Sequence, residues 1–138
     1  MSATVLVWVG TGSALGAVTR YLISLWWLVQ WSQSDSLFPW PTLIANLLGS
    51  VLIVLVHVMS EPGGRLRLSV QARAGLLGGF CGGLTTMSVF SLETLLLIES
   101  GHAWLALIYV LCALSLWPLA GAIGYAGATY LQSAPRRS

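Results

Sequence analysis

Charged residues are scarce in this chain. Only 7% of its 138 residues are charged, whereas an ordinary soluble domain carries roughly a quarter, and 57% are hydrophobic. The mean hydropathy of +0.84 agrees with this composition. So few polar side chains cannot cover a water-facing surface, and the sequence predicts an integral membrane protein without a soluble domain.

Several patterns typical of enzymes and of metal- or nucleic-acid-binding proteins are also missing. No carboxylate pair, Ser/His/Asp set or phosphate-cradling loop occurs, which argues against an enzyme. No lysine-rich stretch or aromatic stacking platform indicates a nucleic-acid partner. Cys81 and Cys112 lie in different apolar runs, which argues against a disulfide framework or a thiolate metal site and favours small, buried, apolar roles.

Four apolar runs are long enough to cross a hydrocarbon core of about 30 Å. They extend over Val5 to Val29, Thr42 to Met59, Ala74 to Ile98 and Ala103 to Leu131. The first run lacks a preceding basic residue and a cleavage site, so we expect a retained span and not a signal peptide. The predicted fold class is all-α integral membrane, with a single transmembrane domain over residues 1–138.

The arginines are unevenly divided between the two ends of the predicted spans. If both termini share a side, that side carries five arginines, and the opposite loops hold no Arg or Lys but only Asp35, Glu99 and His102. The positive-inside rule then places both termini in the cytoplasm. The five residues are Arg65, Arg67, Arg73, Arg136 and Arg137.

Small and polar residues line one face of the first span. Gly12, Gly16, Arg20 and Ser24 lie four residues apart. The two glycines would allow another helix to approach closely. Arg20 requires a partner, a water-filled vestibule or a position near the interface, because a mid-span arginine costs roughly 2.5 to 3.5 kcal/mol.

The second span carries a longer polar line. Thr42, Asn46 and Ser50 lie at intervals of four residues, and His57 falls in the same sector. An amide at membrane depth is costly to leave unpaired, so Asn46 is expected to hydrogen-bond another helix or a permeating species. His57 is near the end of the span and is expected to be exposed at the interface.

The third span contains the segment GGFCGGLTTMSVFS, Gly78 to Ser91. We expect the glycines to break the helix within GGFCGG and to free carbonyls that could coordinate a hard cation. The hydroxyls that follow could line a narrow passage. These residues favour an ion site over a structural kink and leave the ion unidentified.

These motifs resemble those of the CrcB/Fluc family of small fluoride channels. The resemblance runs in the same order through GSALGAVTRYLI, PTLIANLLGS and GGFCGGLTTMSVFSLET. It implies an antiparallel dimer of four-helix subunits with dual topology, two pores, and a third helix broken at the membrane midplane. It also implies passive, fluoride-selective export through a bacterial inner membrane.

The same resemblance implies the site residues. A structural sodium ion at the dimer interface would be held by the backbone carbonyls of Gly82 and Thr85. The fluoride path would include Asn46, Phe90, Met87, Ser88, Ser91, Thr86, Tyr109 and Thr42, with Arg20 at the vestibule.

Two positions depart from the family pattern. Met87 replaces the first of two pore phenylalanines, so one aromatic edge is missing. In the fourth span, Ala113 and Trp117 stand at positions that are often polar, and Ser115 could supply a hydroxyl if the helix register shifted around Pro118.

Two alternative functions follow from the charges. Five arginines against none disfavour insertion in both orientations, so the chain could be a fixed-orientation, non-conducting or half-active subunit of an antiparallel heterodimer with a paralogous partner. A small multidrug or guanidinium antiporter has the same span count but needs an embedded carboxylate, for which Glu93 is the only candidate. For Glu93 we instead expect a helix cap or an interhelical hydrogen bond.

Overall fold

The computed structural model describes residues 2–31 and 36–133, which form helices and connecting loops. Helices in four regions of this described part are long and apolar enough to cross a membrane. They are Ala3–Gln30, Trp40–Met59, Val70–Glu99 and Ala103–Ser133. All four predicted spans are therefore confirmed, each slightly longer than predicted, and the chain is a multi-pass membrane protein.

The first, second and fourth spans are single helices, named α1 (Ala3–Gln30), α2 (Trp40–Met59) and α6 (Ala103–Ser133). The third span is composite. It consists of α3 (Val70–Ala74), the π-helix η1 (Gly75–Cys81), α4 (Gly82–Leu84) and, after a break, α5 (Ser88–Glu99).

A glycine ends α5 and turns the chain into α6. Gly101 has a φ of 82°, a left-handed conformation that glycine adopts without steric cost. The N–H of Gly101 donates to the carbonyl of Ile98 at 3.0 Å, and that of His102 donates to the carbonyl of Leu97 at 2.8 Å. This pair of hydrogen bonds is a Schellman motif, and it allows a sharp reversal of direction between two long helices.

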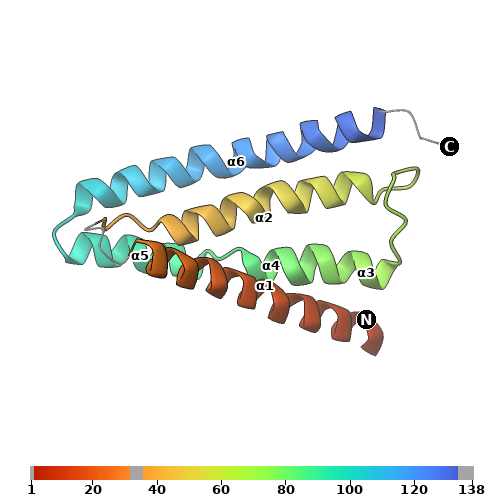
Figure 1. The fold of residues 1–138 in the computed structure, drawn as a ribbon, viewed down its shortest axis with the longest axis horizontal. Helices are drawn as coiled ribbons and strands as arrows, with labels where there is room; N and C mark the ends of the chain where they lie inside the picture. Colours follow the sequence, from red (N-terminus) through yellow and green to blue (C-terminus); the bar gives the residue numbers. More distant parts are fainter. Residues whose placement is uncertain (1, 32–35, 134–138) are drawn as a thin grey trace.

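The start of α1, the end of α6 and the α2–α3 loop all lie at one end of the molecule (Figure 1). The predicted grouping of Arg65, Arg67 and Arg73 with the termini is therefore confirmed. Arg136, Arg137 and Asp35 lie outside the described residues.

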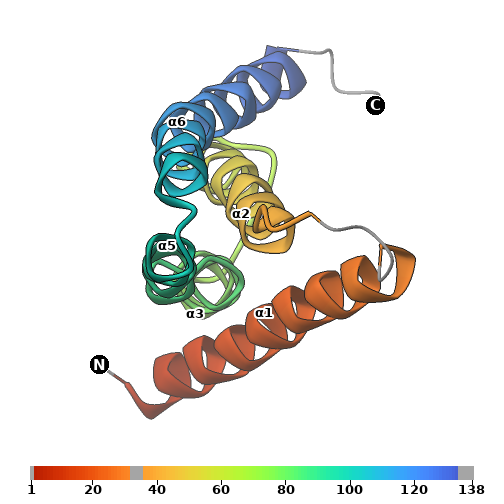
Figure 2. The same ribbon diagram turned by 90° about the vertical axis from the view of Figure 1, so that its left-hand side faces the viewer.

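The four spans form an open arrangement and not a closed bundle (Figure 2). α2 packs mainly against α6, and α1 packs mainly against η1 and α4, whereas α1 and α6 do not contact each other in the described part of the chain. Many large apolar side chains of α1 and α6 remain exposed, among them Leu15, Leu22, Leu114 and Ile123. In a membrane these surfaces face lipid or another subunit.

Glycines allow α1 to cross the third span at very short range. A Cβ on Gly12 would clash with the carbonyl of Gly75, and a Cβ on Gly16 would clash with the carbonyl of Phe80. On the facing helix, a Cβ on Gly79 would lie 2.7 Å from the carbonyl oxygen of Val9. The predicted small-residue contact on the face of Gly12 and Gly16 is therefore confirmed.

The predicted break in the third span is confirmed, but it lies after the glycine run, so its predicted position within GGFCGG is wrong. Gly75–Cys81 continue as a π-helix and Gly82–Leu84 as an α-helix, and the chain leaves the helix at Thr85, where φ is −81° and ψ is 152°. The low helix propensity of glycine is outweighed here, because Gly75, Gly79 and Gly83 permit the close crossing with α1.

Candidate functional site

The polar backbone at the break is satisfied by a side chain from α2. The Oδ1 atom of Asn46 accepts the backbone N–H of Thr86 at 2.7 Å, and its Nδ2 donates to the carbonyl of Thr86 at 3.0 Å. Asn46 is only 4% exposed. Of the two roles predicted for this amide, the structure shows the hydrogen bond to another helix.

The Asn46 contact also determines which carbonyls are free at the break. In a continuous α-helix the N–H of Thr86 would donate to the carbonyl of Gly82, but here it donates to Asn46. Thr85 lies outside any helix, so its carbonyl has no helical partner either. The two carbonyls implied for a cation are thus among those that the break releases.

Arg20 lies beside the same break. Its Nε donates to the carbonyl of Gly83 at 3.4 Å, which joins α1 to the last turn of α4. The structure therefore provides the partner that an arginine inside a span requires. Ser24, on the next turn of α1, donates its hydroxyl to the carbonyl of Arg20.

The hydroxyls after the break mainly organise the start of α5. The Oγ1 of Thr86 accepts the N–H of Val89 at 3.2 Å, as an N-terminal capping residue does, and lies 3.3 Å from the Oγ of Ser88. Ser91 donates its hydroxyl to the carbonyl of Met87. Ser88, Ser91 and Met87, which is 64% exposed, lie on the outer surface of the single chain.

Three helices meet at the carboxyl group of Glu93 on α5. Thr42 of α2 donates its hydroxyl to Oε1 at 2.7 Å, and Tyr109 of α6 donates its hydroxyl to Oε2 at 2.8 Å. Thr42 and Tyr109 are buried. The interhelical hydrogen bond expected for Glu93 is confirmed, and the sequence had not indicated that Thr42 and Tyr109 share this partner.

Aromatic rings connect this carboxyl group to the region of the break. The ring centroid of Phe90 lies 4.9 Å from that of Tyr109 and 5.0 Å from that of Trp117. The rings of Phe90 and Trp117 meet edge to face, with an interplanar angle of 70°. Ala113, one turn of α6 from each of Tyr109 and Trp117, is fully buried and adds no polar atom.

A cavity lies at each end of this aromatic and polar line. One, of about 300 Å³, is lined by Asn46, Ser50, Thr85, Thr86 and Trp117 among others. The second, of about 310 Å³, is lined by Glu93 together with Pro39, Leu97 and Ser100. The first cavity is lined by α2, the break and Trp117 of α6, and the second by α5 and by residues just before α2. The buried residues Thr42, Phe90 and Tyr109 lie on the segments between them.

Ser115 does not take part in this line. α6 runs without interruption from Ala103 to Ser133 and includes Pro118, so the register shift considered from the sequence is absent. The side chain of Ser115 is exposed and donates its hydroxyl to the carbonyl of Leu111.

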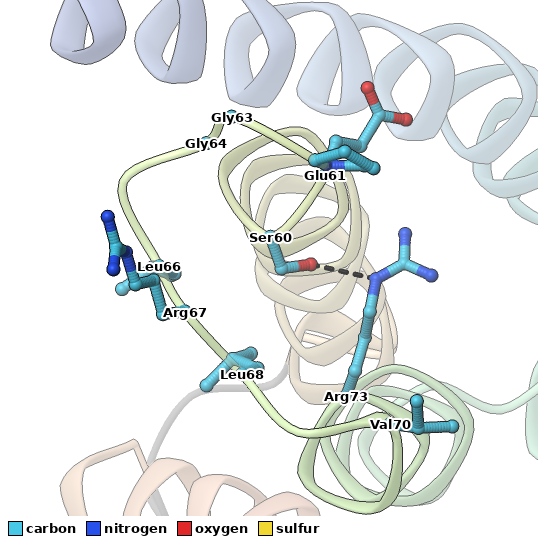
Figure 3. Close-up of a pocket in the computed structure, with 10 residues that line it drawn as sticks. Ser60, Glu61, Gly63, Gly64, Leu66, Arg67, Leu68, Val70 and Arg73 are labelled. Atoms are coloured by element: carbon cyan, nitrogen blue, oxygen red, sulfur yellow. Dashed lines mark hydrogen bonds between the residues drawn. The ribbon is translucent and has the colours of Figure 1, made fainter.

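A further cavity, of about 610 Å³, lies at the α2–α3 loop, away from Asn46 (Figure 3). Arg73 points toward Ser60, to whose Oγ its Nε donates at 2.9 Å, and it also contacts Nδ1 of His57 at 2.9 Å. Nε2 of His57 lies 3.2 Å from the carboxylate of Glu61. The exposure expected for His57 is confirmed, and its contacts join the end of α2 to the start of the third span.

The described residues contain no group of three or more His, Cys, Asp or Glu side chains that could hold a metal ion. Cys81 is buried, as predicted, whereas Cys112 is only partly buried.

A family model described as CrcB-like protein, Camphor Resistance (CrcB), matches residues 7–125. The chain belongs to this family. The resemblance noted in the three motifs thus extends over nearly all of the four spans.

Relatives from several bacteria are similar over most of their length. The chain is 36% identical over 124 residues to "Fluoride-specific ion channel FluC 1" of Bradyrhizobium diazoefficiens, covering 90% of this chain and 84% of the relative. It is 39% identical over 123 residues to the protein of the same name from Rhodopseudomonas palustris, covering 89% and 85%. It is 41% identical over 128 residues to "Fluoride-specific ion channel FluC" of Hahella chejuensis, covering 91% and 95%.

Proposed function

We propose that this chain forms a fluoride-selective channel that exports fluoride passively across a bacterial inner membrane. One observation supports this most directly: a line of buried polar and aromatic side chains joins two cavities within a membrane-spanning fold. The line runs from Trp117, which lines the first cavity together with Asn46, through Phe90 and Tyr109 to Glu93. Relatives that match most of the chain are named fluoride-specific ion channels.

A narrow path of this kind must replace the hydration shell of a small anion with hydrogen-bond donors. The Nδ2 of Asn46 carries two hydrogens, and the bond to Thr86 uses one of them, so a second can face the 300 Å³ cavity. The ring edge of Phe90 carries partial positive charge and offers a weaker attraction. No covalent chemistry is required of any residue along the line.

A sodium ion bound at the break would have a structural and an electrostatic role. The carbonyls of Gly82 and Thr85, released as described above, are oxygen ligands of the kind that hard cations prefer. A cation held there would make the surrounding path more favourable for an anion. Gly82 is exposed in the single chain, so this site would be completed by a second subunit.

We propose an antiparallel dimer as the functional unit. The exposed positions of Gly82, Met87, Ser88 and Ser91 on the third span would then face the partner or the path beside it. The partner is a second copy of this chain or a paralogous subunit, and the concentration of Arg65, Arg67 and Arg73 at one end supports the second arrangement.

Fluoride efflux from liposomes that contain only this purified chain tests the proposal. A fluoride electrode would follow release under a potassium fluoride gradient with valinomycin, and a parallel measurement would use chloride. We expect rapid release of fluoride without chloride, and a marked loss of release in Phe90→Ile. Absence of release from demonstrably dimeric protein would reject the homodimeric channel in favour of a half-active subunit of a heterodimer.

The contacts of Glu93 argue against the antiporter alternative. A proton-coupled exchanger needs a carboxylate that substrate can reach and that can exchange its hydrogen-bond partners. Both carboxyl oxygens of Glu93 are held by hydroxyls of other helices.

A further inference from the structure

The indole nitrogen of Trp117 is buried, and its N–H has no hydrogen-bond partner. Indole can only donate a hydrogen bond, so no rotation of its hydrogen or change of protonation can satisfy it internally. Unpaired buried donors are unfavourable and uncommon in native proteins. An unpaired donor of this kind therefore calls for an explanation by function or by a bound species.

The position of Trp117 places this donor within the proposed path. The side chain lines the 300 Å³ cavity together with Asn46 and Thr86. Its ring also packs edge to face against Phe90, which in turn contacts Tyr109. Trp117 thus forms part of the boundary between the cavity and the buried aromatic segment.

Other donors near this boundary are few or already engaged. The hydroxyl of Tyr109 donates to Glu93, and Ala113 contributes only a methyl group. The hydroxyl of Ser115, although close in sequence, is exposed and bonded to its own helix. Of these α6 residues, Trp117 is consequently the one with an unengaged hydrogen-bond donor beside the cavity.

We propose that the indole N–H of Trp117 is an anion-binding donor that receives fluoride as the ion leaves the Asn46 cavity for the aromatic segment. The inference rests on the proposed function. Because the N–H is shielded from water, an anion that reaches it after a small displacement of the ring does not compete with a hydration shell. A small anion with high charge density forms the stronger hydrogen bond with this donor, which offsets part of the larger cost of dehydrating fluoride.

Trp117→Phe is the matched test, because it removes the N–H and keeps an aromatic, apolar side chain. We expect fluoride efflux from liposomes to fall about tenfold or more, the loss that corresponds to one charge-assisted hydrogen bond. Trp104→Phe is the control, since Trp104 lies on the same helix but is 73% exposed. Efflux of Trp117→Phe equal to that of Trp104→Phe, from equally well-folded protein, would overturn the proposal.

A second measurement separates this inference from the proposed function. Indole ¹H–¹⁵N correlation spectra of the wild-type chain would be recorded during titration with sodium fluoride and, in parallel, sodium chloride. The signal of Trp117 is identified among the seven tryptophans by its absence in Trp117→Phe. We expect this signal to shift with fluoride and not with chloride.

The combined outcomes are distinguishable. A shift with fluoride in a chain that releases none would support the donor role of Trp117 while rejecting the homodimeric channel. A Trp117 signal that does not move, or that moves equally with chloride, would overturn the inference even if the chain conducts.

Discussion

The side-chain amide of Asn46 is paired at both of its ends with the backbone of Thr86, at 2.7 and 3.0 Å. It replaces the peptide group that a continuous helix would have supplied, and it fixes α2 to the third span at the break. In lipid no water is available to hydrogen-bond the unpaired N–H and carbonyl groups at a helix break. The side chain of Asn46 pairs with them instead, and this makes the break energetically acceptable.

Replacing Asn46 by Asp keeps an oxygen that can accept the N–H of Thr86 but removes the donor to its carbonyl and adds a negative charge. We expect the free energy of unfolding to fall by about 1 to 3 kcal/mol and fluoride efflux to fall at least tenfold. Thermal unfolding in detergent and liposome efflux provide the two measurements. Ser50→Ala, which lines the same cavity, is the control, and an Asn46→Asp protein with the stability and efflux of this control would contradict the assignment.

The shared carboxyl group of Glu93 predicts coupling between Thr42 and Tyr109, which lie on different helices. Thr42→Val and Tyr109→Phe each remove one hydroxyl donor with little change in shape, and each is expected to lower the unfolding free energy by about 1 to 3 kcal/mol. The decrease in unfolding free energy of the double variant should differ from the sum of the two single decreases, because both hydroxyls donate to the same carboxyl group. Additive losses in thermal unfolding would show that the two hydrogen bonds act independently.

The crossing of α1 and the third span depends on the absence of a side chain at Gly16. Gly16→Ala places a methyl group against the carbonyl of Phe80 and should destabilise the protein by about 1 to 3 kcal/mol, despite the better helix propensity of alanine. Gly10→Ala, on the same helix with nothing within 4 Å, should be neutral or slightly stabilising. Equal melting temperatures for the two variants would be inconsistent with the close crossing.

The exposed position of Gly82 gives a test of the proposed dimer. Among the described residues, no atom outside the local helix lies within 4 Å of a Cβ at Gly82, so Gly82→Leu should leave the subunit folded but interfere with a partner at the break. Gly127→Leu, which has equally open space on α6, serves as the comparison. Size-exclusion chromatography with light scattering should show a larger monomer fraction for Gly82→Leu, whereas unchanged dimerisation would argue against a subunit contact at this position.

The spans could be predicted because length and apolarity alone determine them, and the contact face of Gly12 and Gly16 followed from a spacing of four residues. The position of the break could not. The third span stays helical through its glycines while α1 packs on Gly79 and Gly83, and the chain leaves the helix where Asn46 accepts the N–H of Thr86. The packing of α1 and the hydrogen bond to Asn46 are both tertiary contacts, and a short stretch of sequence does not reveal them.

The contacts among the candidate site residues could not be predicted from the sequence. Asn46, Thr42, Tyr109 and Phe90 were each identified, yet the sequence did not reveal that two of them converge on Glu93. Trp117 was noted only as a departure from a polar pattern, because an indole N–H without a partner becomes visible only when its surroundings are known. A pore-lining role for Ser88 and Ser91 stays a prediction that depends on the dimer.

The contacts at the break also bear on how the protein is made. Asn46 precedes Thr86 by 40 residues, and Arg20 precedes Gly83 by 63. Ribosomal synthesis therefore delivers both polar side chains to the bilayer before the backbone that they satisfy. When the third span inserts, Asn46 and Arg20 are available to hydrogen-bond its backbone, so unpaired peptide groups need not face lipid. Because of the order of the spans, the first two are already present to hydrogen-bond the broken backbone of the third when it enters the membrane.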